Sequence, residues 1–155
     1  MKFKDVVTVE GAADQVWEYV GSPEMWPLFH VKARECRHVR GQPDAIGALY
    51  DMDFRLGSRV SPTRCEIVEY RVGRVIRLTS MLPTTDGKSG RRLSARLTYE
   101  LEDLGRQTRV REEIDFDSSG IPFVFRPLVW LISRLGRPTG ETTLMCLKRL
   151  VEEES

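Results

Sequence analysis

The sequence contains few residues that bind metals or form disulfides, with three cysteines and two histidines among its 155 residues. Cys36, Cys65 and Cys146 are widely spaced and form no CxxC pair. We therefore expect no disulfide framework, and a reducing cytoplasm is the expected location. His30 and His38 have no ligand-like spacing around them, so the sequence predicts no metal site.

An excess of charge of either sign is also missing. Lys and Arg number 24 and Asp and Glu number 23, which gives a net charge of +1. A nucleic-acid binder normally has a strongly basic face or tail, so we expect no nucleic-acid partner. The opening residues "MKFKDVVTVE" alternate polar and apolar side chains and lack the continuous apolar stretch of a secretory signal peptide.

Motifs for nucleophilic catalysis and phosphate binding are missing as well. The sequence has no GxSxG elbow and no recognisable Cys-His arrangement. The segment "GRPTG" at 136–140 lacks the lysine and the spacing of a phosphate-binding loop. We therefore predict that the protein uses no nicotinamide or nucleotide cofactor, and indeed no cofactor.

No apolar run is long enough to cross a bilayer, which takes about 20 apolar residues. The most apolar stretch, "IPFVFRPLVWLISRLGRPTG" at 121–140, is interrupted by Arg126, Arg134 and prolines. We interpret it as the first half of a C-terminal helix that breaks at 136–140, a candidate hinge, and resumes in "ETTLMCLKRLVEEES". Transient docking of "FVFRPLVWLI" on anionic lipid remains an alternative.

The elements that are present follow an order typical of a single α+β domain spanning residues 1–155. A β-branched strand at 3–10 precedes a helix with Val16, Trp17 and Val20 on one side, and a second short helix begins near Ser22. From about residue 31 to 116, turn spacing favours consecutive antiparallel strands. Because one face of such a sheet is apolar, the final helix should lie across it, and a ligand would fit between them.

Several phrases resemble the SRPBCC or START-like superfamily, particularly its polyketide cyclase/dehydrase-type members. They are "VTVEGAADQVWEYVGSPEMWPLF", "GALYDMDF", "CEIVEY", "LTYELEDLGRQTRVREEIDF" and "LKRLVEEE", so the similarity covers nearly the whole chain. The resemblance implies a helix-grip fold, in which a seven-stranded antiparallel sheet wraps around a long C-terminal helix, with two short helices after the first strand. It also implies a cavity for a hydrophobic or amphipathic small molecule. It implies no particular reaction, because a shared fold is weak support for shared chemistry.

Glu112 is the most informative single residue. In "TRVREEIDF", Val110, Ile114 and Phe116 should face the core, and strict alternation places Glu112 with them. A buried carboxylate has to be paired, protonated or exposed to a cavity. It is therefore either a pocket acid that orients a ligand or transfers a proton, the partner of a rim arginine such as Arg37, or a side chain turned outward by a bulge.

Alternation along the strands also supplies candidate residues for the wall of a ligand site. The phenols of Tyr50 and Tyr99 are candidates for binding a ligand carbonyl or hydroxyl, although such tyrosines more often complete a core. The predicted ligand-binding residues on the sheet side are Tyr50, Met52, Phe54, Ile76, Leu78, Leu97, Tyr99, Glu112 and Ile114. Those on the helix side are Phe123, Trp130, Leu131 and Leu135.

The leading hypothesis is non-covalent binding of a hydrophobic small molecule, such as a lipid, polyketide or aromatic metabolite, by a carrier or sensor. The alternative is an enzyme of the polyketide cyclase/dehydratase type, with Glu112 as acid/base and a tyrosine holding the developing oxyanion. A third hypothesis is a lipid chaperone that acts at membrane surfaces or with a protein partner. The sequence leaves all three open.

Overall fold

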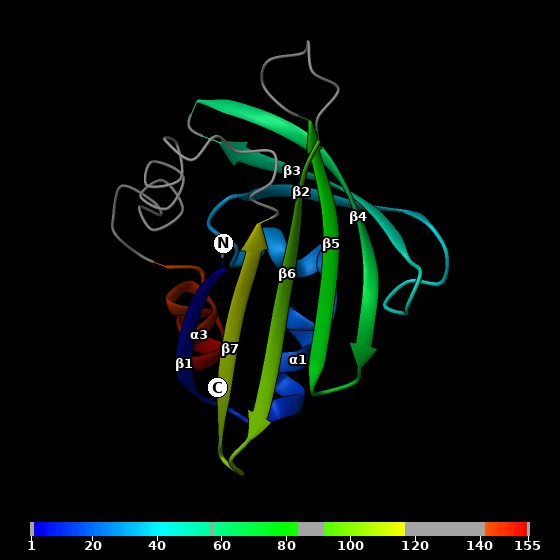
Figure 1. Ribbon diagram of the computed structural model, residues 1–155. Coiled ribbons are helices and arrows are strands. Elements are labelled where there is room, and N and C mark those ends of the chain that lie inside the picture. Colours follow the sequence, from blue (N-terminus) through cyan, green and yellow to red (C-terminus); the bar gives the residue numbers. More distant parts are fainter. Residues whose placement is uncertain (1, 57, 84–91, 117–141, 155) are drawn as a thin grey trace.

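One antiparallel sheet dominates the part of the chain that the computed structural model describes, which is residues 2–56, 58–83, 92–116 and 142–154. Within these residues its seven strands are β1 (Lys2–Glu10), β2 (Ala33–Arg40), β3 (Leu49–Leu56), β4 (Arg59–Arg71), β5 (Val75–Pro83), β6 (Arg92–Asp103) and β7 (Gln107–Phe116). Their order is β1-β7-β6-β5-β4-β3-β2, so the predicted consecutive pairing of β2 to β7 is confirmed. In Figure 1, β2 and β3 run across the upper part of the molecule, steeply inclined to β1, β6 and β7. The sheet is therefore strongly curved.

Side-chain alternation gives the sheet an apolar inner face. On β3, Tyr50 and Met52 are fully buried and Phe54 is partly buried, whereas Arg55 is exposed, so these three alternating residues share the inner face as predicted. The same inner face continues across four neighbouring strands through a ladder of paired residues: Ile67, Leu78, Leu97 and Ile114. Cross-strand apolar pairs of this kind hold the register of an antiparallel sheet.

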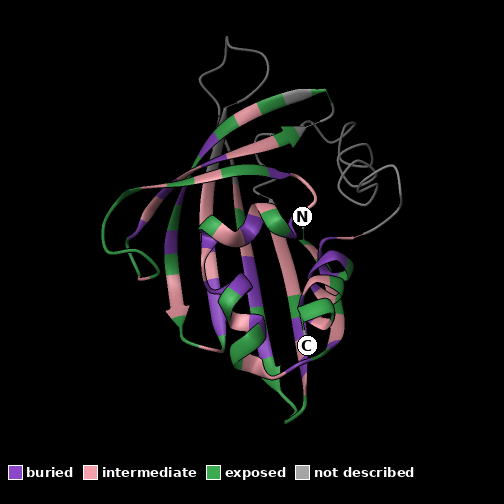
Figure 2. Ribbon diagram, turned by 180° about the vertical axis from the view of Figure 1, so that it is seen from behind, coloured by how far each residue is buried: buried purple, intermediate pink, exposed green. Residues whose placement is uncertain are grey.

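The helices in the described residues are α1 (Ala13–Val20), the 3-10 helix η1 (Pro23–Leu28) and α3 (Thr143–Glu154). Figure 2 shows all of them on the same side of the sheet, against the face where buried residues gather. Two short helices after the first strand are thus confirmed. Trp17 on α1 packs against Tyr70 on β4, with ring centroids 5.4 Å apart, so aromatic contact joins this helix to the sheet.

Helix α3 packs along β1, the strand at one edge of the sheet. Leu147 and Val151 lie one helical turn apart and are both buried. The Lys148 ammonium donates a hydrogen bond to Thr8 O at 3.1 Å, so a side chain of α3 satisfies a backbone group on the outer edge of β1. Helix α3 therefore covers part of the edge of β1, and covering an edge strand protects it from pairing with another chain.

The remaining sequence expectations for the C-terminal helix lie outside the described residues. These are the first half of that helix, the candidate hinge at 136–140, and the helix-side candidates Phe123, Trp130, Leu131 and Leu135. In the portions of the chain that the structure describes, no helix is long and apolar enough to cross a membrane.

Candidate functional site

Glu112 lies on the inner face of the sheet, as the alternation predicted. It pairs with Asp5 on β1 and with Tyr99 on β6, and the register of β7 passes through it without a bulge. The Tyr99 hydroxyl donates a hydrogen bond to Glu112 Oε2 at 2.6 Å. The two alternatives for Glu112 are therefore wrong: there is no bulge, and Arg37 instead pairs with Glu35, with 2.6 Å between Nη1 and Oε2.

Burial has the largest effect on the proton affinity of Glu112 and raises the pKa of its carboxyl to about 7. The hydrogen bond from Tyr99 and the positive charge of Lys32 lower this pKa, whereas the negative charge of Asp5 raises it. Burial prevails because a carboxylate removed from water loses more hydration than one hydrogen bond restores. Glu112 therefore gains and loses its proton near neutral pH, where a general acid or base is most effective.

Tyr99 is held beside Glu112 by aromatic side chains of the η1 region. It is fully buried, and its ring lies edge-on to Trp26 and to Phe29, with centroids 5.1 and 6.0 Å apart. Trp26 is itself held in place, since its indole N–H donates to Val20 O at 2.9 Å. Burial and the charge of Glu112 raise the pKa of Tyr99 well above its ordinary value, so the phenol keeps its proton and acts as a donor.

The connection between η1 and β2 adds two polar residues that the sequence had not suggested as part of this site, His30 and Lys32. The His30 ring is 5% exposed, stacks on Trp26 with centroids 6.4 Å apart, and lies edge-on to Phe54 at 5.7 Å. Burial lowers the pKa of His30 to about 3, so the imidazole is neutral. Burial also lowers the pKa of Lys32, and the charge of Glu112 partly offsets this effect.

The tautomer of His30 follows from its hydrogen bond. His30 Nδ1 lies 3.2 Å from the backbone nitrogen of Lys32 and accepts the hydrogen bond from its N–H. The proton of the neutral ring therefore sits on Nε2. His30 and Lys32 lie in the irregular connection between η1 and β2, so no repeating spacing in the sequence could have placed them at this site.

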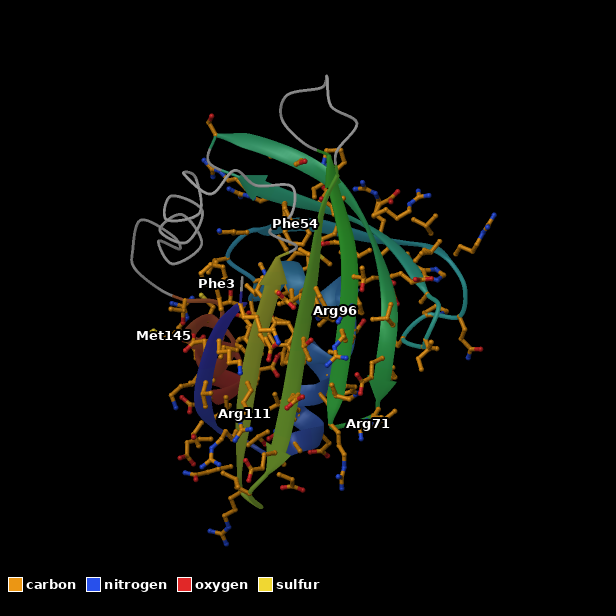
Figure 3. All side chains as sticks on the ribbon, viewed as in Figure 1. Phe3, Phe54, Arg71, Arg96, Arg111 and Met145 are labelled. Carbon is orange, nitrogen blue, oxygen red and sulfur yellow. The ribbon has the colours of Figure 1, made fainter. Side chains whose placement is uncertain are left out.

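The inner face is packed at one end and partly accessible at the other. On β6 and β7, the inner-face residues on the α1 side of the Tyr99–Glu112 pair, Leu101 and Val110, are buried. On the opposite side of that pair, Leu97 and Ile114 keep part of their surface accessible, as do Phe3 and Phe54. Figure 3 places Phe3 and Phe54 in the upper half of the molecule. Glu112 thus lies at the boundary between the packed core and a partly accessible apolar end.

The other predicted sheet-side residues have structural contacts of their own. The Tyr50 hydroxyl accepts a hydrogen bond from the Asp44 N–H at 2.9 Å and lies 3.3 Å from Asp44 Oδ1, so it holds the turn between β2 and β3. Three more of the predicted residues are packed in the core cluster: Met52, Ile76 and Leu78. A ligand contact at any of these positions stays a prediction.

Comparisons with known proteins agree with this architecture. The profile of the family described as polyketide cyclase / dehydrase and lipid transport matches residues 1–152. No curated protein sequence gives a significant match. Three similar solved structures, described below, are 12–14% identical to this chain, so their likeness shows the fold alone.

Three of these structures illustrate the shared fold. A START superfamily protein from Mycobacterium smegmatis is 14% identical, with 99% of each chain covered and a TM-score of 0.69. Zhui aromatase/cyclase from Streptomyces sp. R1128 is 12% identical, with 99% of this chain and 94% of that chain covered and a TM-score of 0.65. Major latex-like protein 151 from Panax ginseng is 14% identical, with 99% and 96% covered and a TM-score of 0.64. The predicted helix-grip fold is thereby confirmed.

Proposed function

Because the chain belongs to the polyketide cyclase / dehydrase and lipid transport family, we propose that it binds a hydrophobic or amphipathic small molecule against the accessible end of its inner sheet face, as a carrier or sensor. The observation that carries this proposal is the position of Glu112. Its carboxyl lies where the packed core gives way to partly accessible apolar side chains, with its pKa raised to about 7. Carboxyls perturbed in this way by burial are concentrated at functional sites.

Apolar contact would supply most of the affinity. Phe3, Phe54, Leu97 and Ile114 are partly accessible around the boundary, and each square ångström of apolar surface that a ligand covers contributes about 25 cal/mol. Glu112 would orient the ligand through one polar contact, as is typical of small-molecule sites. The sequence-predicted residues Phe123, Trp130, Leu131 and Leu135 are proposed to form the opposite wall.

The test is to fill the proposed site and to compare this with an equal change on the opposite face. Leu97→Trp adds an indole to the accessible end, whereas Arg96→Trp adds the same group to the exposed outer face of the same strand. The probe is N-phenyl-1-naphthylamine, a neutral apolar dye whose fluorescence rises in apolar surroundings. We expect Leu97→Trp to weaken dye binding by about tenfold or more and Arg96→Trp to leave it nearly unchanged. Equal binding by both variants, or no binding by the native protein, would refute the proposal.

A second candidate function is an enzyme of the cyclase or dehydratase type, and the observation that favours it is the Tyr99–Glu112 pair. A general acid/base works best when its pKa lies near the working pH, and that of Glu112 is about 7. The neutral phenol of Tyr99 donates to Glu112 and becomes a donor for a developing oxyanion only once Glu112 has taken up a proton. In this alternative the ligand is a carbonyl compound, and Glu112 moves a proton to or from it.

A further inference from the structure

The two oxygens of the Glu112 carboxyl have different surroundings. Oε2 accepts the hydrogen bond from the Tyr99 hydroxyl at 2.6 Å. Oε1 accepts no hydrogen bond from any residue in the described part of the chain. Among the described residues, this second oxygen is therefore the acceptor of the pair that remains available to a ligand. The Tyr99 hydroxyl has one proton, and it donates this proton to Oε2. While Glu112 is ionised, the pair therefore offers a ligand a hydrogen-bond acceptor but no donor.

The charges around this acceptor come from three sides. Asp5 lies opposite Glu112 on β1. Its Oδ1 accepts a hydrogen bond from the backbone N–H of Val6 at 2.9 Å, and it forms no ion pair with any described residue. Lys32, on the connection to β2, is close enough to affect the pKa of Glu112. Tyr99 on β6 is neutral, and so is His30 beside Lys32. Among the described residues, two carboxylates and one ammonium therefore surround this site when Glu112 is ionised.

These surroundings discriminate between ligand head groups. A carboxylate would bring a further negative charge next to Glu112 and Asp5, among apolar side chains where unpaired charge is costly. An ammonium would have to leave water and lie near Lys32. A neutral hydroxyl loses far less hydration, and its proton meets the acceptor that the Tyr99–Glu112 pair leaves open.

We infer that the ligand is an apolar molecule carrying a phenol or alcohol hydroxyl, which donates a hydrogen bond to Glu112 Oε1, and that the site rejects apolar carboxylates. This inference rests on the proposed function, since it names the class of ligand that the same site takes. It has a direct consequence for proton balance. A donor ligand binds the ionised carboxylate and not the protonated one, so binding expels a proton from those molecules in which Glu112 is protonated.

The pKa of about 7 for Glu112 sets the size of this effect. The ionised fraction of the free protein rises from about one tenth at about pH 6 to about nine tenths at about pH 8. The affinity for a hydroxyl ligand should therefore rise about tenfold over this interval. A ligand of the same shape without a donor should show no such rise.

Titration calorimetry of the full chain with three naphthalene probes tests the inference. 2-Naphthol carries the donor, 2-methoxynaphthalene has the same apolar body without it, and 2-naphthoate carries a carboxylate. We expect 2-naphthol to bind about tenfold or more tightly than the ether at about pH 8, with an affinity that falls about tenfold at about pH 6. We expect 2-naphthoate to bind more weakly than the ether at both pH values.

Proton release provides a measurement that needs no variant. At about pH 7, binding of 2-naphthol should release about half a proton per protein molecule, which the buffer takes up. The binding enthalpies measured in phosphate and in Tris should therefore differ by about half of the difference between the ionisation enthalpies of these buffers. In Glu112→Gln the pH dependence should disappear. Equal affinities of 2-naphthol and the ether, no proton release, or tighter binding of 2-naphthoate would overturn the inference while leaving the proposed function intact. If none of the three probes binds, the proposed function itself fails.

Discussion

Replacing Glu112 by glutamine should stabilise the protein at alkaline pH, although it removes a hydrogen-bonded carboxylate. The pKa of Glu112 is about 7 in the folded protein, against an ordinary value of 4.5. Between these values the folded state holds a proton that the unfolded chain has released, so stability falls as pH rises from about 4.5 to about 7. Above that interval, the difference between the two pKa values corresponds to about 3 kcal/mol of lost unfolding free energy.

The glutamine variant has no charge to desolvate and avoids this loss, but it does not recover all of it. Its amide can still accept the Tyr99 hydrogen bond, while its NH2 group needs partners of its own, which costs about 1 kcal/mol. The net gain at about pH 8 is therefore about 2 kcal/mol, or about 4–8 °C in melting temperature for a domain of this size. At about pH 5, where folded Glu112 is protonated, the variant should lie within about 1 kcal/mol of the native protein.

Urea unfolding followed by circular dichroism at both pH values measures this difference. Glu113→Gln is the matched control, because Glu113 is the next residue on β7, faces the other side of the sheet, and pairs with Lys2 at 3.7 Å near the surface. A surface pair of this kind contributes at most about 1 kcal/mol. If Glu112→Gln is destabilising by the same amount at both pH values, then Glu112 is ionised in the folded protein throughout this range. That result would refute the desolvation argument and, with it, the predicted proton release.

Two further predictions concern the turn at Tyr50 and the catalytic alternative. Tyr50→Phe should destabilise the protein by about 1–2 kcal/mol in the same unfolding assay, because the Asp44 N–H loses its acceptor; an unchanged midpoint would contradict the role of Tyr50 in the turn. If a substrate is found, Glu112→Gln should lower its turnover by about 100-fold or more while largely preserving binding, and Glu113→Gln should leave turnover unchanged. Native turnover in Glu112→Gln would exclude Glu112 as the acid/base.

The predicted position of Glu112 shows how far local pattern reaches. Its inner-face placement followed from alternation with Val110 and Ile114, and it is correct because β7 contains no bulge at this point. His30 and Lys32 could not be placed in the same way. They lie in the irregular connection between η1 and β2, where no repeating spacing fixes the direction of a side chain.

The identity of the Glu112 partner shows where local pattern stops. From the sequence, Arg37 was a reasonable candidate, since oppositely charged residues on neighbouring strands often pair. The strand order places β2 at one edge of the sheet and β7 near the other, so Arg37 pairs with Glu35 instead. Tyr99 became the partner because the β6–β7 register sets it directly opposite Glu112.

By itself, the sequence determined the order of the elements and, in regularly alternating strands such as β3 and β7, the face on which a residue lies, because both follow from backbone geometry over a few residues. Only the tertiary structure decided that Glu112 meets Tyr99, that its pKa rises to about 7, and that the accessible end of the inner face begins there. These properties depend on the pairing of residues far apart in the chain and on the amount of water that their packing removes. Desolvation is a property of the whole packed environment, which no short stretch of sequence specifies.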